Sequence, residues 1–281
     1  MAKGIKKKTE AVVDEAAYSP GMERLARFGY GTKGLVYIVV GALSAQVAIG
    51  WGGRTADTNG AFREIETQPL GKAALATVAF GLIGYVLWRW IQALADTAHK
   101  GTKLKGVLIR IGYFFSGAVY AGLAYTAAKA LIDIEEPRSS SDAQEHWIAR
   151  VLTMPFGRAL IIGAGACVIG FGLYQIYKGL AAKFRKGLKL YEMNKTEDAW
   201  ATWSGRIGYS ARGVVFCIMG FFVIQAAVNY RPHEAKGVDE VLGTLAQISY
   251  GAWLLGAVAA GLIAFGFYMI IEARYRRIAG S

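Results

Sequence analysis

The chain has 281 residues and is 54% hydrophobic, with 19% charged residues and a mean hydropathy of +0.31. Average soluble chains carry about 25% charged residues, so this composition argues against a soluble globular protein. The 32 Lys and Arg against 20 Asp and Glu give a net charge of +12, which in so apolar a chain points to a membrane surface before nucleic acid.

Six long stretches free of Asp, Glu, Lys and Arg follow one another along the chain. A helix needs about 20 residues to cross the hydrocarbon core of a bilayer, and each stretch approaches or exceeds that length. The sequence therefore predicts an all-α integral membrane protein with six transmembrane helices. The stretches are residues 34–53, 73–88 (continuing apolar to residue 95), 111–128, 159–177, 213–230 and 241–271, the last long enough for a surface segment and a span.

Positive charge is distributed unevenly between the two sides of the predicted bundle. An even number of spans places both termini on one side. The N-terminal segment up to Arg27, the second and fourth loops and the C-terminal tail carry 19 Lys and Arg, whereas the other three loops carry eight. The positive-inside rule then predicts a multi-pass protein of the bacterial inner membrane with both termini in the cytoplasm. The charged N-terminal segment lacks the apolar core of a signal peptide, so we do not expect it to be cleaved.

One helical hairpin is repeated three times in the chain. Each odd-numbered helix opens with Arg-x-Gly-Tyr, followed by Gly four residues later and by Tyr or Phe seven residues later. Each even-numbered helix opens with a Pro-x-Gly turn, which is degenerate in the third copy. Because every hairpin starts and ends on the same side, the repeats are parallel and predict pseudo-threefold symmetry about the membrane normal. The odd motifs begin at Arg27, Arg110 and Arg206, and the even-motif glycines are Gly71, Gly157 and Gly251.

This layout resembles the bacterial domain-of-unknown-function 1206 family, which is built from tandem two-helix membrane repeats. The family signature is similar to Arg-x-Gly-Tyr-x-x-Arg/Lys-Gly-Val-Val-Tyr on the first helix and Gln-Pro-Phe-Gly-Arg before the second. The resemblance extends from about Arg24 to Tyr275. The second copy departs from it by carrying Ser116 where the others have Lys33 and Arg212, and the third copy lacks the proline. The resemblance implies the architecture and no activity.

The repeats divide the chain into five segments. In each outer loop, apolar residues such as Phe62, Trp147 and Val241 recur with helical spacing before the next span, which predicts short amphipathic helices on the outer face. The segments are a basic cytoplasmic tail (1–23), repeat 1 (24–96), repeat 2 (97–182), repeat 3 with its preceding basic loop (183–277) and a C-terminal tail (278–281).

The repeated residues of the odd helices form one narrow face. Positions 0, 3, 7, 10 and 14 of a helix lie in a single stripe. Along this stripe aromatic residues alternate with small ones, and small residues let helix backbones approach closely in lipid. We interpret the stripe as a packing seam in preference to a cofactor site. Its residues are Tyr30, Gly34, Tyr37 and Gly41 in the first copy, Tyr113, Gly117 and Tyr120 in the second, and Tyr209, Gly213, Phe216 and Gly220 in the third.

The same stripe carries cations toward its cytoplasmic end. Arg27, Arg110 and Arg206 would share one depth, with Lys33 and Arg212 about a turn and a half deeper. Such a group of cations attracts anionic headgroups by about 1 kcal/mol per charge. We take these five as candidate lipid- or anion-binding residues, with ordinary positive-inside anchoring as the competing interpretation.

Two functions follow from this reading. The first is a non-enzymatic structural or accessory protein that binds membrane lipids, in particular anionic phospholipid. The alternative is a channel or small-solute transporter that uses the pseudo-threefold axis as its path, past Gly34, Gly117 and Gly213. The sequence leaves open whether odd or even helices line the centre, and whether a protein partner or a homo-oligomer exists.

Residues that several chemistries need are missing from the spans. His99, His146 and His233 all lie in loops, which argues against a bis-histidine haem. Cys167 and Cys217 fall within spans without a metal or redox spacing, and we expect both to be buried structural thiols. No HExxH, GxSxG or P-loop pattern is present. We therefore expect no enzymatic activity, no cofactor, no metal and no nucleic-acid partner.

Overall fold

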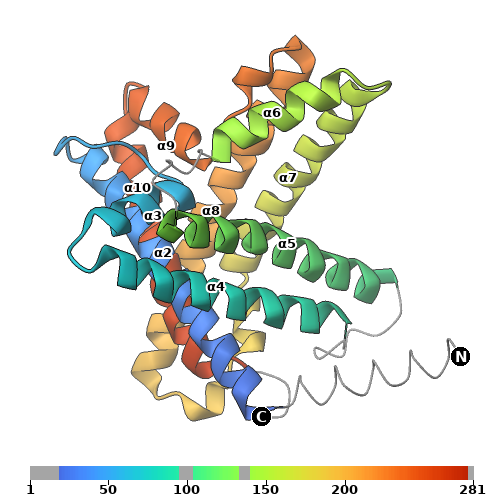
Figure 1. The fold of residues 1–281 in the computed structure, drawn as a ribbon. Coiled ribbons are helices and arrows are strands. Elements are labelled where there is room, and N and C mark those ends of the chain that lie inside the picture. Colours follow the sequence, from blue (N-terminus) through green and yellow to red (C-terminus); the bar gives the residue numbers. More distant parts are fainter. Residues whose placement is uncertain (1–18, 95–103, 133–139, 278–281) are drawn as a thin grey trace, which may run out of the picture.

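The computed structural model describes residues 19–94, 104–132 and 140–277, apart from the side chains of 104–105 and 140–143. Residues 1–18 of the predicted N-terminal tail (1–23), the predicted C-terminal tail (278–281) and His99 in the second loop lie outside the described residues. Six of the described helices are long and apolar enough to cross a membrane, which confirms the prediction of an all-α, multi-pass membrane protein (Figure 1). They are α2 (Pro20–Ala48), α4 (Gly71–Leu94), α5 (Leu104–Ile132), α7 (Gly157–Leu180), α8 (Lys195–Asn229) and α10 (Gly251–Tyr275).

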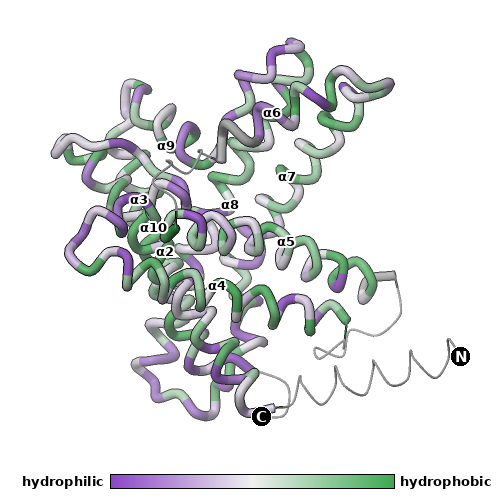
Figure 2. Tube along the Cα trace, in the orientation of Figure 1, coloured by the Kyte–Doolittle hydropathy of each residue, from purple (hydrophilic) through white to green (hydrophobic). Residues whose placement is uncertain are grey.

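Shorter helices lie in the connections, at the ends of the hydrophobic segments (Figure 2). Side-chain caps explain where two of the long helices, α2 and α8, begin. The Ser19 side chain accepts a hydrogen bond from the Met22 N–H at 3.2 Å, and α8 opens with a reciprocal capping box between Asn194 and Glu197. The short elements are α3 (Thr58–Thr67), α6 (Ser140–Leu152), η1 (Lys183–Gly187), η2 (Leu190–Glu192), η3 (Pro232–Glu234) and α9 (Val238–Gln247).

A tight turn that requires glycine joins each of the short helices α3, α6 and α9 to the spanning helix that follows it, which is α4, α7 or α10. At the first of these turns the Gly71 N–H donates to the Gln68 carbonyl oxygen at 2.7 Å. A Cβ atom added here would lie 2.2 Å from a carbonyl oxygen of the preceding short helix, and the corresponding distances are 1.8 Å at Gly157 and 2.3 Å at Gly251. No side chain fits at these positions. This explains why the third copy keeps its glycine although it has lost the proline.

The most extensive helix interfaces join different repeats. Helix α4 packs on α5, α7 packs on α8, and α10 returns to pack on α2. The second spanning helix of each repeat (α4, α7 or α10) therefore packs on the first spanning helix of the next repeat, and the last repeat packs on the first. Within repeats, α2 packs on α4 and α8 packs on α10. The described residues of repeat 2 form no such interface between α5 and α7, which diverge in Figure 1.

Paired glycines bring two of these interfaces to backbone contact. Gly34 of α2 faces Gly266 of α10, and a Cβ atom on either would lie 2.7 or 2.6 Å from the carbonyl oxygen of the other. Gly213 of α8 and Gly172 of α7 repeat this arrangement at 2.6 and 2.7 Å. At the α4–α5 interface the position equivalent to Gly172 and Gly266 is Val86. That interface therefore lacks the glycine pair.

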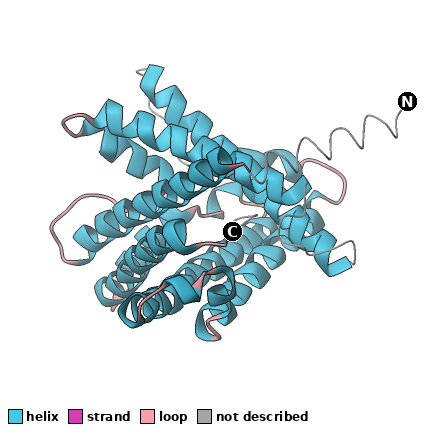
Figure 3. Ribbon diagram, turned by 90° about the horizontal axis from the view of Figure 1, so that it is seen from below, coloured by secondary structure: helices cyan, strands magenta, loops and turns pink. Residues whose placement is uncertain are grey.

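The end of the bundle where α2 begins and α10 ends is here called the terminal face; Figure 3 looks onto it from below. The chain between α7 and α8 folds against this face. The Phe184 ring stacks on Tyr209 with centroids 5.4 Å apart, and the Lys189 N–H donates to the Tyr275 carbonyl oxygen at 2.7 Å. The predicted basic loop therefore packs against the ends of α8 and α10 at the terminal face.

Candidate functional site

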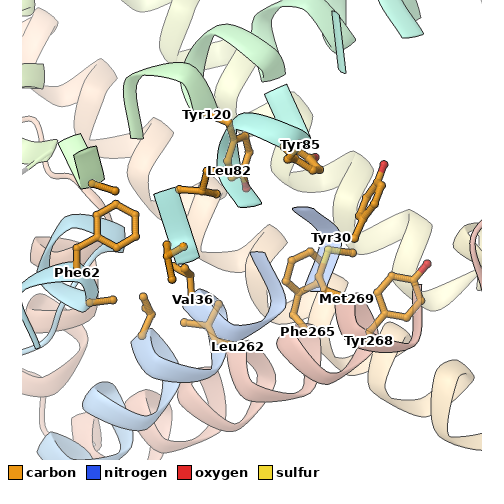
Figure 4. Close-up of a cluster of buried hydrophobic side chains, with 14 of the residues drawn as sticks. Tyr30, Val36, Phe62, Leu82, Tyr85, Tyr120, Leu262, Phe265, Tyr268 and Met269 are labelled. Atoms are coloured by element: carbon orange, nitrogen blue, oxygen red, sulfur yellow. The ribbon is translucent and has the colours of Figure 1, made fainter. Parts of the chain in front are cut away.

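Cations and aromatic rings meet inside the bundle, in the half nearer the terminal face. Every spanning helix supplies at least one of them. Figure 4 shows the rings of Tyr85, Tyr30 and Phe265 gathering from α4, α2 and α10. The group, here called the aromatic–cation cluster, consists of Tyr30, Lys33, Tyr37, Tyr85, Arg89, Tyr113, Tyr120, Lys178, Tyr209, Arg212, Phe265, Glu272 and Arg276.

Lys33 and Arg89 share one hydroxyl group as a hydrogen-bond acceptor. Tyr85, which is fully buried, accepts from Lys33 Nζ at 3.2 Å and from Arg89 Nε and Nη2 at 2.8 and 2.6 Å. The Lys33 ammonium also lies 4.5 Å from the Tyr120 ring centroid, and the Arg89 guanidinium lies 5.2 Å from the Tyr113 ring centroid. Lys33 is only 5% exposed, so its charge is held by rings and one hydroxyl instead of by a carboxylate.

The other three cations lie close to the same rings. The Arg212 guanidinium is 5.4 Å from the centroid of Tyr37, whose ring also lies 6.0 Å from Lys33 Nζ. Lys178 Nζ donates to the Tyr209 hydroxyl at 3.0 Å and lies 4.1 Å from the centroid of that ring, and Tyr209 packs edge-on against Phe265, whose ring the Arg212 guanidinium also contacts. Arg276 lies 4.5 Å from the Tyr30 ring centroid. Shared aromatic rings therefore link the five cations into one group.

Negative charge in the cluster is far short of the positive charge. Among the described residues, Glu272 is the carboxylate that contacts these cations, and it pairs with Arg276. Five basic side chains thus meet one carboxylate, so basic groups outnumber acidic ones in the cluster. Burying an unpaired charge costs several kcal/mol, whereas each ring contact returns about 0.5–2 kcal/mol.

Hydrogen-bond donors in the cluster also remain unused. The Tyr30 Oη and Arg212 Nε atoms are buried without a hydrogen-bond partner, and Tyr30 is only 1% exposed. A buried donor without an acceptor is costly, because it has lost its hydrogen bonds to water. Excess positive charge and free donors are the features that stabilise an oxyanion.

The five cations chosen from the sequence fall into three groups. Lys33 and Arg212 lie in the cluster. Arg27 Nη1 donates to the carbonyl oxygen of Ala273 at 2.9 Å and to that of Arg274, at the end of α10. Arg110 makes the equivalent contact with the end of α4, to the carbonyl oxygens of Ala93 and Leu94 at 2.7 and 2.8 Å. Arg206 is exposed. The structure therefore does not bring the three stripe arginines together.

The recurring seam residues lie at helix interfaces or in the cluster. Tyr30, Tyr120 and Tyr209 are buried, whereas Tyr37, Tyr113 and Phe216 are half-buried. Gly34 and Gly213 form the glycine pairs described above. Two helical turns further along α2 and α8, Gly41 and Gly220 pack on the backbones of α10 and α7. Gly117 lies under the Trp90 ring. The three glycines expected beside an axial path thus lie at interfaces between helices.

Sequence reasoning missed three cluster cations and misplaced one thiol. Arg89, Lys178 and Arg276 are not among the site residues predicted from the sequence, because each follows an apolar stretch and so fits the charged end of a span. Only the convergence of all six helices shows that these side chains turn inward. Cys167, expected to be buried, is exposed, while Cys217 is half-buried. The reason for this correction is that α5 does not cover the face of α7 on which Cys167 lies.

Comparison with known proteins gives two matches. A family model described as Domain of Unknown Function (DUF1206) matches residues 28–96, 111–182 and 207–276, which correspond to the three predicted repeats. The chain is also similar to a protein of Bacillus subtilis (strain 168) described as Uncharacterized protein YxxB, with 36% identity over 259 residues, 92% of this chain and 93% of that protein. No solved structure matches the chain.

Proposed function

Since the chain belongs to the DUF1206 family, whose description names no activity, we propose its function from its geometry: a non-enzymatic membrane protein that binds the headgroup of an anionic phospholipid at the aromatic–cation cluster. We place it in the bacterial inner membrane with the terminal face toward the cytoplasm. The observation that carries the proposal is the excess of positive charge in the cluster, where five cations meet one carboxylate.

A phosphate group has the chemistry that the cluster lacks. Its oxygens accept hydrogen bonds from guanidinium, ammonium and hydroxyl groups, and arginine can bind two of them at once. The free Arg212 Nε and Tyr30 Oη are donors of this kind. Lys33 lies six residues beyond Arg27 on α2, which places it about 9 Å further along the helix from the terminal face. A headgroup bound there would be drawn below the ordinary interface. Free inorganic phosphate shares this chemistry, so the experiment below separates the two.

The proposal includes the symmetry that the sequence suggests. We take the repeats to be related by a pseudo-threefold axis along the membrane normal, with the cluster near it. Support comes from the packing of the second spanning helix of each repeat on the first spanning helix of the next repeat. The Gly34–Gly266 pair also recurs as Gly213 and Gly172. We also take α3, α6 and α9 to lie on the outer face as amphipathic helices, because apolar residues such as Phe62 and Leu242 are buried against the bundle.

Arg27 and Arg110 have a different task in this proposal. Both direct a guanidinium at the carbonyl oxygens that end a neighbouring helix. The C-terminal end of a helix carries a partial negative charge, and a cation there is worth about 0.3–1 kcal/mol. These arginines therefore hold α10 and α4 in place. The residues that bind the lipid headgroup are Lys33, Arg212 and their neighbours in the cluster.

The test is the lipid that co-purifies with the protein. We expect Lys33→Gln combined with Arg212→Gln to reduce the anionic phospholipid retained after detergent purification by several-fold, as measured by quantitative mass spectrometry. Lys72→Gln, an exposed cation at the opposite end of α4, is the matched control and should leave retention unchanged. Arg110→Gln should also retain lipid. A wash with excess inorganic phosphate should not displace the lipid, because its chains add to the binding.

Two results would overturn the proposal. One is unchanged anionic lipid in a double variant that unfolds at the same temperature as the parent protein. The other is displacement of all bound phosphorus by free phosphate, which would identify a soluble anion as the ligand.

A further inference from the structure

In repeats 1 and 3 a small-residue contact lies at an equivalent place between the two helices of the repeat. In repeat 1, Thr32 of α2 lies against Gly81 of α4, where an added Cβ atom would be 2.0 Å from Thr32 Oγ1. In repeat 3, Ala211 of α8 lies against Gly261 of α10, with a corresponding distance of 2.2 Å to the Ala211 Cβ. Both contacts depend on a small side chain meeting a glycine.

Repeat 2 has large residues in the same two places. Aligned on the Gly-Tyr motif, the counterpart of Thr32 is Phe115, and aligned on the even motif, the counterpart of Gly81 is Cys167. Phe115 is 64% exposed and Cys167 is exposed as well. A phenyl ring and a thiol do not fit into the space that a threonine or alanine side chain and the hydrogen of a glycine fill in the other repeats. The sequence of repeat 2 therefore accounts for the divergence of α5 and α7.

Neighbouring positions on the same faces are open too. Gly112 of α5 and Gly170 of α7 have no atom within 4 Å of an added Cβ, whereas Gly29, the repeat 1 counterpart of Gly112, lies against the backbone of α4. Tyr174 of α7 is 54% exposed, although its counterpart Trp88 in repeat 1 is 1% exposed. We call this exposed strip on α5 and α7 the open flank: Leu108, Gly112, Phe115, Cys167, Gly170 and Tyr174.

The open flank borders the aromatic–cation cluster. Tyr113 follows Gly112 on α5, and its ring lies 5.2 Å from the Arg89 guanidinium. Lys178 lies one turn beyond Tyr174 on α7 and donates to Tyr209 of α8. Both side chains are half-buried. At the level of the cluster, the bundle is thus flanked by an apolar surface on one side and by excess positive charge on the other.

We propose that the open flank is the lateral entrance through which an anionic phospholipid reaches the cluster, with its phosphate among the cations and one acyl chain lying between α5 and α7. This inference rests on the proposed function and adds the route and the position of the chain. An amphiphile with a negative headgroup matches both halves of the surface. Its chain would cover Leu108 and Phe115, and its phosphate would first meet Arg89 and Lys178, the cluster cations that border the flank.

The experiment uses the full-length protein in phosphatidylcholine vesicles that contain phosphatidylglycerol with a photoreactive diazirine in one acyl chain. We expect the cross-links to concentrate on peptides of α5 and α7 that carry the open flank. Restoring the small-residue contact of the other repeats with Phe115→Thr and Cys167→Gly should reduce these cross-links several-fold. Phe80→Thr, at a similarly exposed phenylalanine on α4, is the matched control and should not reduce them.

The native thiol supplies a second measurement that needs no closing variant. In mild detergent, alkylation of Cys167 by a maleimide should slow several-fold when phosphatidylglycerol is added and not when phosphatidylcholine is added, while alkylation of Cys217 should not change. Unaltered alkylation of Cys167, or cross-links spread evenly over all exposed helix faces, would overturn the inference, as would cross-links to a second copy of the chain along the open flank.

Failure of this inference is distinguishable from failure of the proposed function. If the closing variant still retains anionic lipid and Lys33→Gln with Arg212→Gln loses it, the cluster binds lipid that arrives by another route. If the parent protein retains no anionic lipid at all, the proposed function itself is wrong.

Discussion

Tyr85 is the residue on which the arrangement of the cluster depends most directly. Its single hydroxyl oxygen accepts hydrogen bonds from both Lys33 and Arg89, and its ring lies 4.8 and 4.9 Å from these two cations. Two like charges are thereby held close together around one acceptor. The Tyr30 ring packs edge-on against the Tyr85 ring with centroids 5.2 Å apart. Unlike the Tyr85 hydroxyl, the Tyr30 hydroxyl has no hydrogen-bond partner.

We expect Tyr85→Phe to destabilise the delipidated protein by about 1.5–3 kcal/mol, the usual loss for hydrogen bonds to charged groups. Tyr30→Phe should have little effect on the stability of the same protein, since it removes a hydroxyl that bonds to nothing. Unfolding in mixed micelles measures both. Equal losses for the two variants would show that ring packing, and not the shared hydroxyl, stabilises this region.

At the scale of helices, the paired glycines decide how closely two elements approach. The α2–α10 and α7–α8 interfaces each contain such a pair, and the α4–α5 interface has Val86 in its place. Close backbone approach gains van der Waals contact, which is the main attraction between helices within a lipid environment.

Gly213→Ala should therefore weaken the α7–α8 interface. Its Cβ atom would lie 2.6 Å from the Gly172 carbonyl oxygen, so the helices must separate, at a cost of about 1–3 kcal/mol. Gly122→Ala is the matched control, because that glycine is exposed on α5 with nothing within 4 Å of the added atom. There alanine should stabilise the helix by about 0.5–1 kcal/mol. Thermal unfolding in detergent checks the opposite signs; a stabilised Gly213→Ala variant would contradict the close contact.

On the scale of the whole molecule, orientation in the membrane is the property on which the proposed ligand depends. The cluster lies in the half of the bundle nearer the terminal face, so we expect the bound headgroup to come from the leaflet on that side. The uneven distribution of Lys and Arg between the two sides argues for the cytoplasm.

Single cysteines in a chain without Cys167 and Cys217 test this orientation. Arg54→Cys lies in the exposed connection before α3, and Lys186→Cys lies at the terminal face. A membrane-impermeant maleimide applied to intact cells should label position 54 and leave position 186 unlabelled until the cells are broken. Labelling in the reverse order would place the terminal face outside.

Much of the architecture could be predicted from the sequence, and the site only in part. Span length and the repeated motifs predicted the helices and the repeats, because uncharged length and turn glycines act locally. Lys33 and Arg212 were found because they recur at equivalent positions. Arg89 and Arg276 were not, since their inward direction depends on how helices from different repeats converge. The fate of Arg27 and Arg110 was hidden for the same reason: their carbonyl partners lie in neighbouring helices.

The return of α10 to α2 has a consequence for biosynthesis. Among the described spanning helices α2 is made first, and its Gly34 meets Gly266 only after α10 has been made. Until then one face of α2 must be covered by lipid or by an insertion chaperone. A chain that stops before Gly251 would leave that face permanently bare, so quality-control proteases should remove such products while sparing chains that carry changes in α3, α6 or α9.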